Sequence, residues 1–255
     1  MVQGFCCKLE SWYYQISFFK EKMMVIAYDN RGIGKSSRPD DPYSLDTLVD
    51  DLKNLLEYLN IREQIHLCGF SNGSAIAQSF TLKYPYLVKT LILLGAASHM
   101  PNTEYEQSLK AVEAFKSLSL EQIIRLTLPN MFSLPFRKKL KRDKELFKLY
   151  KNDIGLIAHL NDPPRYEDYI NQWKILKGFD TRDLLPNIKQ PTLIVVGSKD
   201  QGNILASKNI YEKIPNSKIE ILENVGHAII IESPETTNRV IWNFLKHHLT
   251  INNTN

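Results

Sequence analysis

IHLCGFSNGS, at residues 65–74, is the stretch of sequence that decides the fold. An apolar run leads into Ser71, glycines stand two positions to either side of it at Gly69 and Gly73, and helix-forming residues follow. This G-x-S-x-G spacing predicts a strand, a sharp turn and a helix. A serine at the tip of such a turn lies in strained backbone, and side chains at the two glycine positions would collide with the strand and the helix. An ordinary glycine-bounded turn is the alternative interpretation.

Outward from this stretch, short apolar runs typical of buried strands alternate with segments of helical periodicity. The strands expected are residues 23–28, 65–68, 88–94, 191–197 and 219–222, and the helices are residues 12–19, 45–59, 74–85, 204–214 and a last one from 234. Ser44 and Ser233 are the residues expected to cap two of these helices. Continuous apolar strands that alternate with helices predict an α/β fold, in which a mostly parallel sheet is flanked by helices and ligands bind at the carboxyl ends of the strands.

Residues 99–169 interrupt this alternation, because they have helical periodicity throughout and are punctuated by prolines. We interpret them as an inserted helical cap on a core formed by residues 1–98 and 170–255. Within the insertion, residues 137–142 (RKKLKR) form a dense basic run. Such a run could attract acidic substrates or a membrane surface, but a solvated helix face is the interpretation that we favour.

The composition excludes several classes of protein. Hydrophobic residues make up 43% and charged residues 24% of the 255 residues, which is ordinary for a soluble globular chain. A net charge of +4, without zinc-finger spacing or an aromatic RNA-binding motif, does not indicate a nucleic-acid partner. The run GKS at residues 34–36 resembles part of a phosphate-binding loop, but the glycine required five positions earlier is Asp29, so we exclude a nucleotide loop.

The expected setting is the cytoplasm. Three cysteines, two of them adjacent, make a poor disulfide framework and favour a reducing compartment. No apolar run reaches the roughly 18 residues needed to span a bilayer, so we expect no stable membrane insertion. The sequence does not indicate an oligomeric state.

Three residues with complementary chemistry follow three of the expected strands, in the order Ser71, Asp200, His227. A serine hydroxyl is a weak nucleophile that needs a histidine to take its proton. That histidine in turn needs a carboxylate to orient it and to stabilise the imidazolium. Any one of these residues is more often structural, whereas three in this order at successive strand ends indicate a catalytic triad.

Motifs along nearly the whole chain carry a resemblance to a known family. The matching residues are Gly4-Phe5 with Trp12, the D-x-R-G-x-G-x-S run at 29–36, Gly69-x-Ser71-x-Gly73, Pro191-Thr192-Leu193 through Gly197 to Asp200, and Gly226-His227 through Glu232 to Pro234-Glu235. With these residues the chain resembles an α/β-hydrolase-fold serine hydrolase of the capped, esterase/haloperoxidase-like type.

The resemblance implies a role for each matching site residue. Ser71 would be the nucleophile in a turn permitted by Gly69 and Gly73, His227 the general base and then acid, and Asp200 the orienting carboxylate. The backbone N–H groups of Phe5 and Asn72 would form the oxyanion hole. The cap would set the choice of substrate, and no cofactor or metal is implied.

The chain departs from the family pattern in three places. Gln3 stands where the family usually has histidine, and we expect its side chain to brace the loop by hydrogen bonding. Asn72 replaces a commoner methionine or glutamine and keeps the backbone donor. The resemblance begins inside the third strand of the usual sheet, so we expect a longer natural product. In the chain as given, the Phe5 donor would be poorly held, and losing one oxyanion donor lowers turnover roughly 100- to 1,000-fold.

These observations favour a cofactor-independent serine hydrolase that forms an acyl-enzyme on Ser71 with a small or medium acyl compound. The bond cleaved could be an ester, a lactone, an amide or an activated carbon–carbon bond, because the same triad supports all four. One alternative is a haloperoxidase-like perhydrolase that uses peroxide in place of water. The other is an impaired or inactive ligand-binding protein with the same fold.

Overall fold

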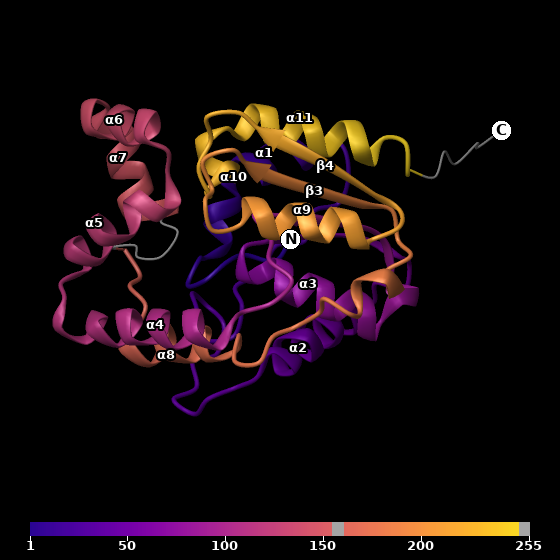
Figure 1. Cartoon of the computed structure of the whole chain (residues 1–255), viewed down its shortest axis with the longest axis horizontal. Coiled ribbons are helices and arrows are strands. Elements are labelled where there is room, and N and C mark those ends of the chain that lie inside the picture. Colours follow the sequence, from indigo (N-terminus) through magenta and orange to yellow (C-terminus); the bar gives the residue numbers. More distant parts are fainter. Residues whose placement is uncertain (155–160, 250–255) are drawn as a thin grey trace.

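The computed structural model describes residues 1–154 and 161–249, and their centre is a four-stranded parallel sheet (Figure 1). The strands lie side by side in chain order: β1 (Ile65–Phe70), β2 (Val88–Leu94), β3 (Thr192–Gly197) and β4 (Ser217–Leu222). All four therefore end at the same edge of the sheet. This arrangement confirms the predicted α/β fold class with a parallel sheet.

Helices cover both faces of the sheet, and the longest of them, α2, buries one apolar face that includes Leu48, Val49, Leu52 and Leu56. They are α1 (Tyr13–Phe19), α2 (Leu45–Tyr58), α3 (Asn72–Lys83), α9 (Ile204–Lys213), α10 (Ile229–Glu232) and α11 (Pro234–Leu245), with short 3-10 turns η1 (Leu9–Trp12), η2 (Pro85–Leu87) and η5 (Leu185–Asn187). Ser44 caps α2 in a reciprocal pair with Thr47, as expected for a serine at this position. Ser233 precedes α11 as predicted, but its side chain makes no capping hydrogen bond.

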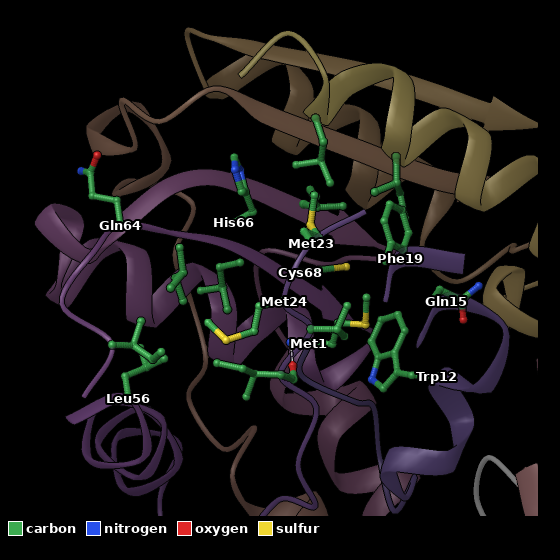
Figure 2. Close-up of a pocket in the computed structure, with 18 of the residues that line it drawn as sticks. Met1, Trp12, Gln15, Phe19, Met23, Met24, Leu56, Gln64, His66 and Cys68 are labelled. Carbon is green, nitrogen blue, oxygen red and sulfur yellow. Dashed lines mark hydrogen bonds between the residues drawn. The ribbon is translucent and has the colours of Figure 1, made fainter. Parts of the chain in front are cut away.

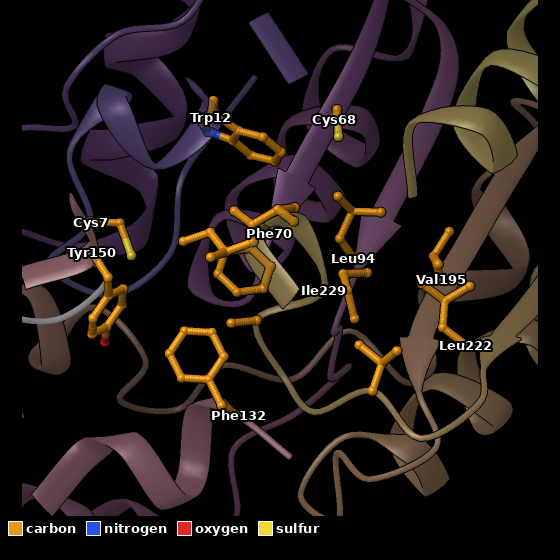
Figure 3. Close-up of a cluster of buried hydrophobic side chains, with 14 of the residues drawn as sticks. Cys7, Trp12, Cys68, Phe70, Leu94, Phe132, Tyr150, Val195, Leu222 and Ile229 are labelled. Carbon is orange, nitrogen blue, oxygen red and sulfur yellow. The ribbon is translucent and has the colours of Figure 1, made fainter. Parts of the chain in front are cut away.

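The strands contribute side chains to two separate apolar cores, one on each face of the sheet, because successive side chains of a strand point to opposite faces. Leu67, Leu93 and Ile194 pack with α2, α3 and α9 on one face. Phe70, Leu94 and Val195 pack with α1 and α11 on the other, and Figure 3 shows them in one cluster with Ile229 and Phe132. Burial on both faces explains why these strands read as continuous apolar runs.

The segment between β2 and β3 is helical in the part that the structure describes. It contains α4 (Asn102–Glu113), η3 (Ala114–Ser117), α5 (Leu120–Met131), α6 (Leu134–Arg142), α7 (Lys144–Leu149), the π-helical turn η4 (Tyr150–Ile154) and α8 (Tyr166–Lys174). Figure 1 shows these helices beyond the carboxyl ends of the strands. The basic run lies on α6, with the side chains of Lys138, Lys139 and Lys141 exposed. No helix of residues 1–154 or 161–249 is both long and apolar enough to cross a bilayer.

The prediction of a buried strand at residues 23–28 was wrong. The segment is not a strand, and the side chain of Met24 is 73% exposed. A strand needs a neighbour to satisfy its backbone groups, and a cavity of about 230 Å³ separates this segment from β1 (Figure 2). Among the described residues, Met1 and Val2 link the two: the Met1 ammonium donates to Ile26 O at 2.8 Å, and Val2 exchanges hydrogen bonds with Cys68 and Phe70. Because residues 23–28 have no paired strand among the described residues, this apolar run forms a loop.

Candidate active site

Ser71 lies at the tip of the turn between β1 and α3. Its backbone has φ 54° and ψ −122°, a conformation that residues with side chains adopt rarely and at a cost. The turn is tight because its two glycines touch backbone atoms. A Cβ atom on Gly69 would lie 2.3 Å from Gly73 O, and one on Gly73 would lie 2.2 Å from Val2 O. The turn therefore requires glycine at both positions and presents the serine side chain at the strand ends.

We expect Gly69→Ala to lower the free energy of unfolding by about 3 kcal/mol or more, because the added methyl group overlaps backbone that cannot move alone. Urea denaturation measures the effect. Gly202→Ala is the matched control, since the nearest heavy atom to its Cβ would lie 3.9 Å away, and we expect a change below about 1 kcal/mol. Equal stability of the two variants would contradict the close approach at Gly69.

His227 and Asp200 follow β4 and β3 and form a buried pair. His227 Nδ1 lies 2.6 Å from Asp200 Oδ2, a short hydrogen bond of the charge-assisted kind. Phe70 packs against the imidazole, with the ring centroids 5.0 Å apart. The Nδ1 atom is thus occupied by the carboxylate, which leaves Nε2 for exchange of a proton.

Asn203 completes the surroundings of the carboxylate. Its amide donates to both oxygens of Asp200, at 3.0 and 3.2 Å, and its backbone N–H donates at 3.3 Å. Burial alone would raise the pKa of Asp200, but the attraction of His227 and the hydrogen bonds from His227 and Asn203 outweigh it, so that the pKa is lowered. Asp200 is therefore held ionised next to the imidazole.

We expect Asn203→Ala to destabilise the protein in a pH-dependent way. A lowered carboxyl pKa stabilises the fold above the unfolded-state value of about 4, and this contribution disappears as the pH falls through the folded-state pKa. Loss of the Asn203 donors makes the lowering of the Asp200 pKa smaller. The difference in free energy of unfolding from wild type is therefore largest near neutral pH and declines below about pH 4. Urea denaturation across this range measures it, with Asn130→Ala as the control, because this exposed residue of α5 lines the same cavity and makes no hydrogen bond to Asp200. A difference that does not depend on pH would contradict this role.

Ser71, Asp200 and His227 line one cavity of about 880 Å³ at the strand ends, together with Phe5 and Asn72. Among residues 1–154 and 161–249, no hydrogen bond joins the Ser71 hydroxyl to the His227 ring. Catalytic hydrogen bonds are often long without substrate and tighten when it binds. The structure therefore brings the three side chains to one cavity but shows a hydrogen bond only for the histidine–aspartate pair.

The two expected oxyanion donors come from different elements. Asn72 is the first residue of α3, where backbone N–H groups have no intrahelical acceptor and the helix dipole favours negative charge. Phe5 lies in the loop after Val2, and no described residue accepts a hydrogen bond from its N–H. Its ring packs edge-on against Trp173 of α8, with the centroids 5.4 Å apart. Tyr169 of the same helix also lies near this ring, with the centroids 6.2 Å apart, so α8 contacts the loop that carries Phe5.

The expectation for Gln3 was wrong. Its side chain is fully buried, and neither its amide nitrogen nor its oxygen has a partner among the described residues. The loop is held instead through its backbone, because the Asn30 amide donates to Gln3 O at 3.3 Å and Leu9 N–H donates to the buried Asp29 carboxylate at 2.8 Å.

No group of three or more acidic, histidine or cysteine side chains within the described ranges could hold a metal ion.

Two further residues shape the site: Asn203 was missed in the sequence, and Glu232 was named there only as part of the family pattern, without a role. Asn203 contacts Asp200, and the only indication of this role in the sequence is that it lies three residues after Asp200. Glu232 accepts the backbone N–H of Gly226 at 3.0 Å and that of Ser133 at 3.1 Å, and it also binds the Ser133 hydroxyl. It thereby ties the histidine loop to the start of α6. Residues 133 and 232 are far apart in the chain, so no local pattern indicates this contact.

Comparisons with known proteins agree with this geometry. A family model described as alpha/beta hydrolase fold matches residues 1–234. A 3-oxoadipate enol-lactonase from Acinetobacter baylyi is 27% identical over 93% of this chain and 84% of the relative, and a proline iminopeptidase from Lactobacillus delbrueckii subsp. bulgaricus is 30% identical over 84% and 77%.

A solved structure has the same fold. A thermophilic esterase from Thermogutta terrifontis superimposes with a TM-score of 0.85 at 24% identity, over 98% of this chain and 89% of that one. The family model covers most of the chain, and the parallel sheet flanked by helices agrees with the fold that it describes. The chain belongs to the alpha/beta hydrolase fold family.

Proposed function

We propose that the protein is a cofactor-independent serine hydrolase that cleaves a small or medium acyl substrate through an acyl-enzyme on Ser71. The observation that carries the proposal is the 2.6 Å hydrogen bond between His227 and Asp200 in the wall of the cavity that Ser71 also lines. The relatives, an enol-lactonase and a proline iminopeptidase, support hydrolysis of a small substrate without choosing the bond.

The proposed reaction proceeds in two halves. His227 Nε2 takes the hydroxyl proton as Ser71 Oγ attacks the acyl carbonyl, and Asp200 stabilises the imidazolium that forms. The negative charge on the carbonyl oxygen is stabilised by the N–H groups of Asn72 and Phe5. Collapse of the tetrahedral intermediate passes the proton to the leaving group, and water, activated by His227, then hydrolyses the acyl-enzyme.

We further propose that residues 99–169 act as a cap that selects the substrate. Support comes from the cavity lining, which includes Val112 of α4, Pro129 and Met131 of α5, and Leu134 of α6 together with the triad. Buried free cysteines support the cytoplasm as the setting, because thiols persist there.

A serine-directed fluorophosphonate probe followed by peptide mapping tests the proposal. We expect the folded protein to be labelled at Ser71, and labelling to disappear after denaturation, because only the assembled site activates the hydroxyl. Folded protein that stays unlabelled at Ser71 would overturn the proposal and favour a ligand-binding protein with the same fold.

A further inference from the structure

Arg137 lines the candidate cavity and, unlike four other arginines of the described residues, pairs with no carboxylate. Four arginines contact a carboxylate oxygen at 2.6–2.9 Å, in the pairs Arg31–Asp51, Arg38–Asp162, Arg165–Asp168 and Arg182–Asp180. Arg137 of α6 lines the cavity with Ser71 and His227, and it also lines a neighbouring cavity of about 610 Å³ formed by α5, α6 and α7. Its guanidinium makes no hydrogen bond or ion pair with any residue of 1–154 or 161–249. The donors on its two Nη atoms are thus left to a ligand or to water.

Arg137 is half-buried, and its Nε atom is enclosed by protein without an acceptor. A guanidinium keeps its charge at all relevant pH values, so burial without a partner costs free energy. A bound anion would offset that cost. The protein thereby holds a permanent positive charge in the wall of the cavity.

The other charges that line the cavity leave Arg137 as the best anion site. Asp200 is engaged by His227 and Asn203. Glu104 and Lys199 are exposed, so water solvates both. The hydrated ammonium of Lys199 gains little binding free energy when an anion replaces its water. The partly desolvated guanidinium of Arg137, which has free donors, gains more.

The helix that carries Arg137 is fixed to the histidine loop. Glu232 joins the backbone of Gly226 to that of Ser133, and Ala228 N–H donates to Met131 O at 2.8 Å. Arg137 lies one helical turn beyond, and its own N–H donates to Ser133 O at 3.0 Å. The separation between the positive charge and His227 is therefore set by direct contacts, as a specificity-determining residue requires.

We propose that Arg137 binds a carboxylate of the substrate, so that the preferred acyl compound carries one negative charge at the end remote from the reacting carbonyl. The planar guanidinium matches a carboxylate through two parallel hydrogen bonds, and one cation neutralises one such charge. This inference rests on the proposed function, because it places the other end of the same molecule at Ser71.

The test compares activated monoesters of linear dicarboxylic acids, from succinate to suberate, with neutral p-nitrophenyl esters of the same chain length. We expect wild-type protein to prefer the anionic ester at one or two lengths. Arg137→Gln should lower the ratio of kcat/KM for anionic over neutral ester about 10- to 100-fold, the range for a hydrogen-bonded charge. Arg137→Lys should restore part of the ratio.

Two variants control for general loss of positive charge. Arg142→Gln changes an exposed arginine on the same helix that does not line the cavity, and Lys199→Gln removes the exposed cation that does. We expect both to leave the ratio within about threefold of wild type. A ratio that is unaffected by Arg137→Gln, or that falls equally in Lys199→Gln, would overturn the assignment.

Calorimetry with Ser71→Ala protein separates this inference from the proposed function, because binding needs no turnover. Monomethyl esters of the same dicarboxylic acids should bind at least about tenfold more tightly than neutral methyl esters, and Arg137→Gln should remove the difference. If no ester is hydrolysed yet this selectivity is found, the proposed function fails and the anion site stands. If esters are hydrolysed and the selectivity is absent, the anion site fails alone.

Discussion

Replacing Ser71 by alanine is expected to lower kcat/KM for p-nitrophenyl butyrate by roughly 10⁵-fold or more. The variant keeps the turn and the cavity but lacks the oxygen that attacks the carbonyl and carries the acyl group. Initial rates of p-nitrophenol release measure the effect, and thermal unfolding checks that the fold is intact.

Ser79→Ala is the matched control for this prediction. It makes the same chemical change on α3, the helix that follows Ser71, but Ser79 does not line the cavity that contains His227. We expect its kcat/KM to stay within about twofold of wild type. Ester turnover that survives in Ser71→Ala at a tenth of the wild-type rate would rule out Ser71 as the nucleophile.

His227→Ala is expected to be about as damaging as Ser71→Ala, because a hydroxyl without a base to take its proton is not activated. The two residues act as a unit, so the double variant should be no slower than either single one. Purified single and double variants assayed side by side with the same ester give the comparison.

His99→Ala controls for loss of an imidazole from this cavity. His99 lines the same cavity, but its Nδ1 has no hydrogen-bond partner among the described residues. In His227 the same atom is bonded to Asp200. We expect a loss of less than about tenfold. A His227→Ala protein that loses no more than His99→Ala would show that another group takes the proton.

Much of the architecture could be predicted from the sequence where local pattern and tertiary contacts agree. The apolar run at 88–94 is buried on both faces and became β2 with the predicted bounds. The glycines around Ser71 face backbone on both sides, which is the reason that their spacing predicts a sharp turn. At such positions the physical requirement is local and therefore visible in a short window.

The failures share a different cause, because each depends on a neighbour that is distant along the chain. Residues 23–28 have a strand-like composition but lack a paired strand. The side chain of Gln3 is buried where no described partner reaches it. Glu232 acquires its role from Ser133, 99 positions away, and Arg137 is of interest because it lines the cavity without a carboxylate partner among the described residues. Such properties are set by tertiary packing, which local periodicity does not encode.

The three free thiols beneath the site provide an internal reporter of its opening. Cys6 and Cys7 adjoin the loop of Phe5, and Cys68 lies on β1 just before the turn at Ser71. Burial raises the pKa of all three, that of Cys68 to about 12, so the reactive thiolate is scarce in the closed protein. Alkylating reagents should therefore modify these three cysteines only when the structure around them opens locally. Mass spectrometry of the modified peptides would time that motion without any substrate present.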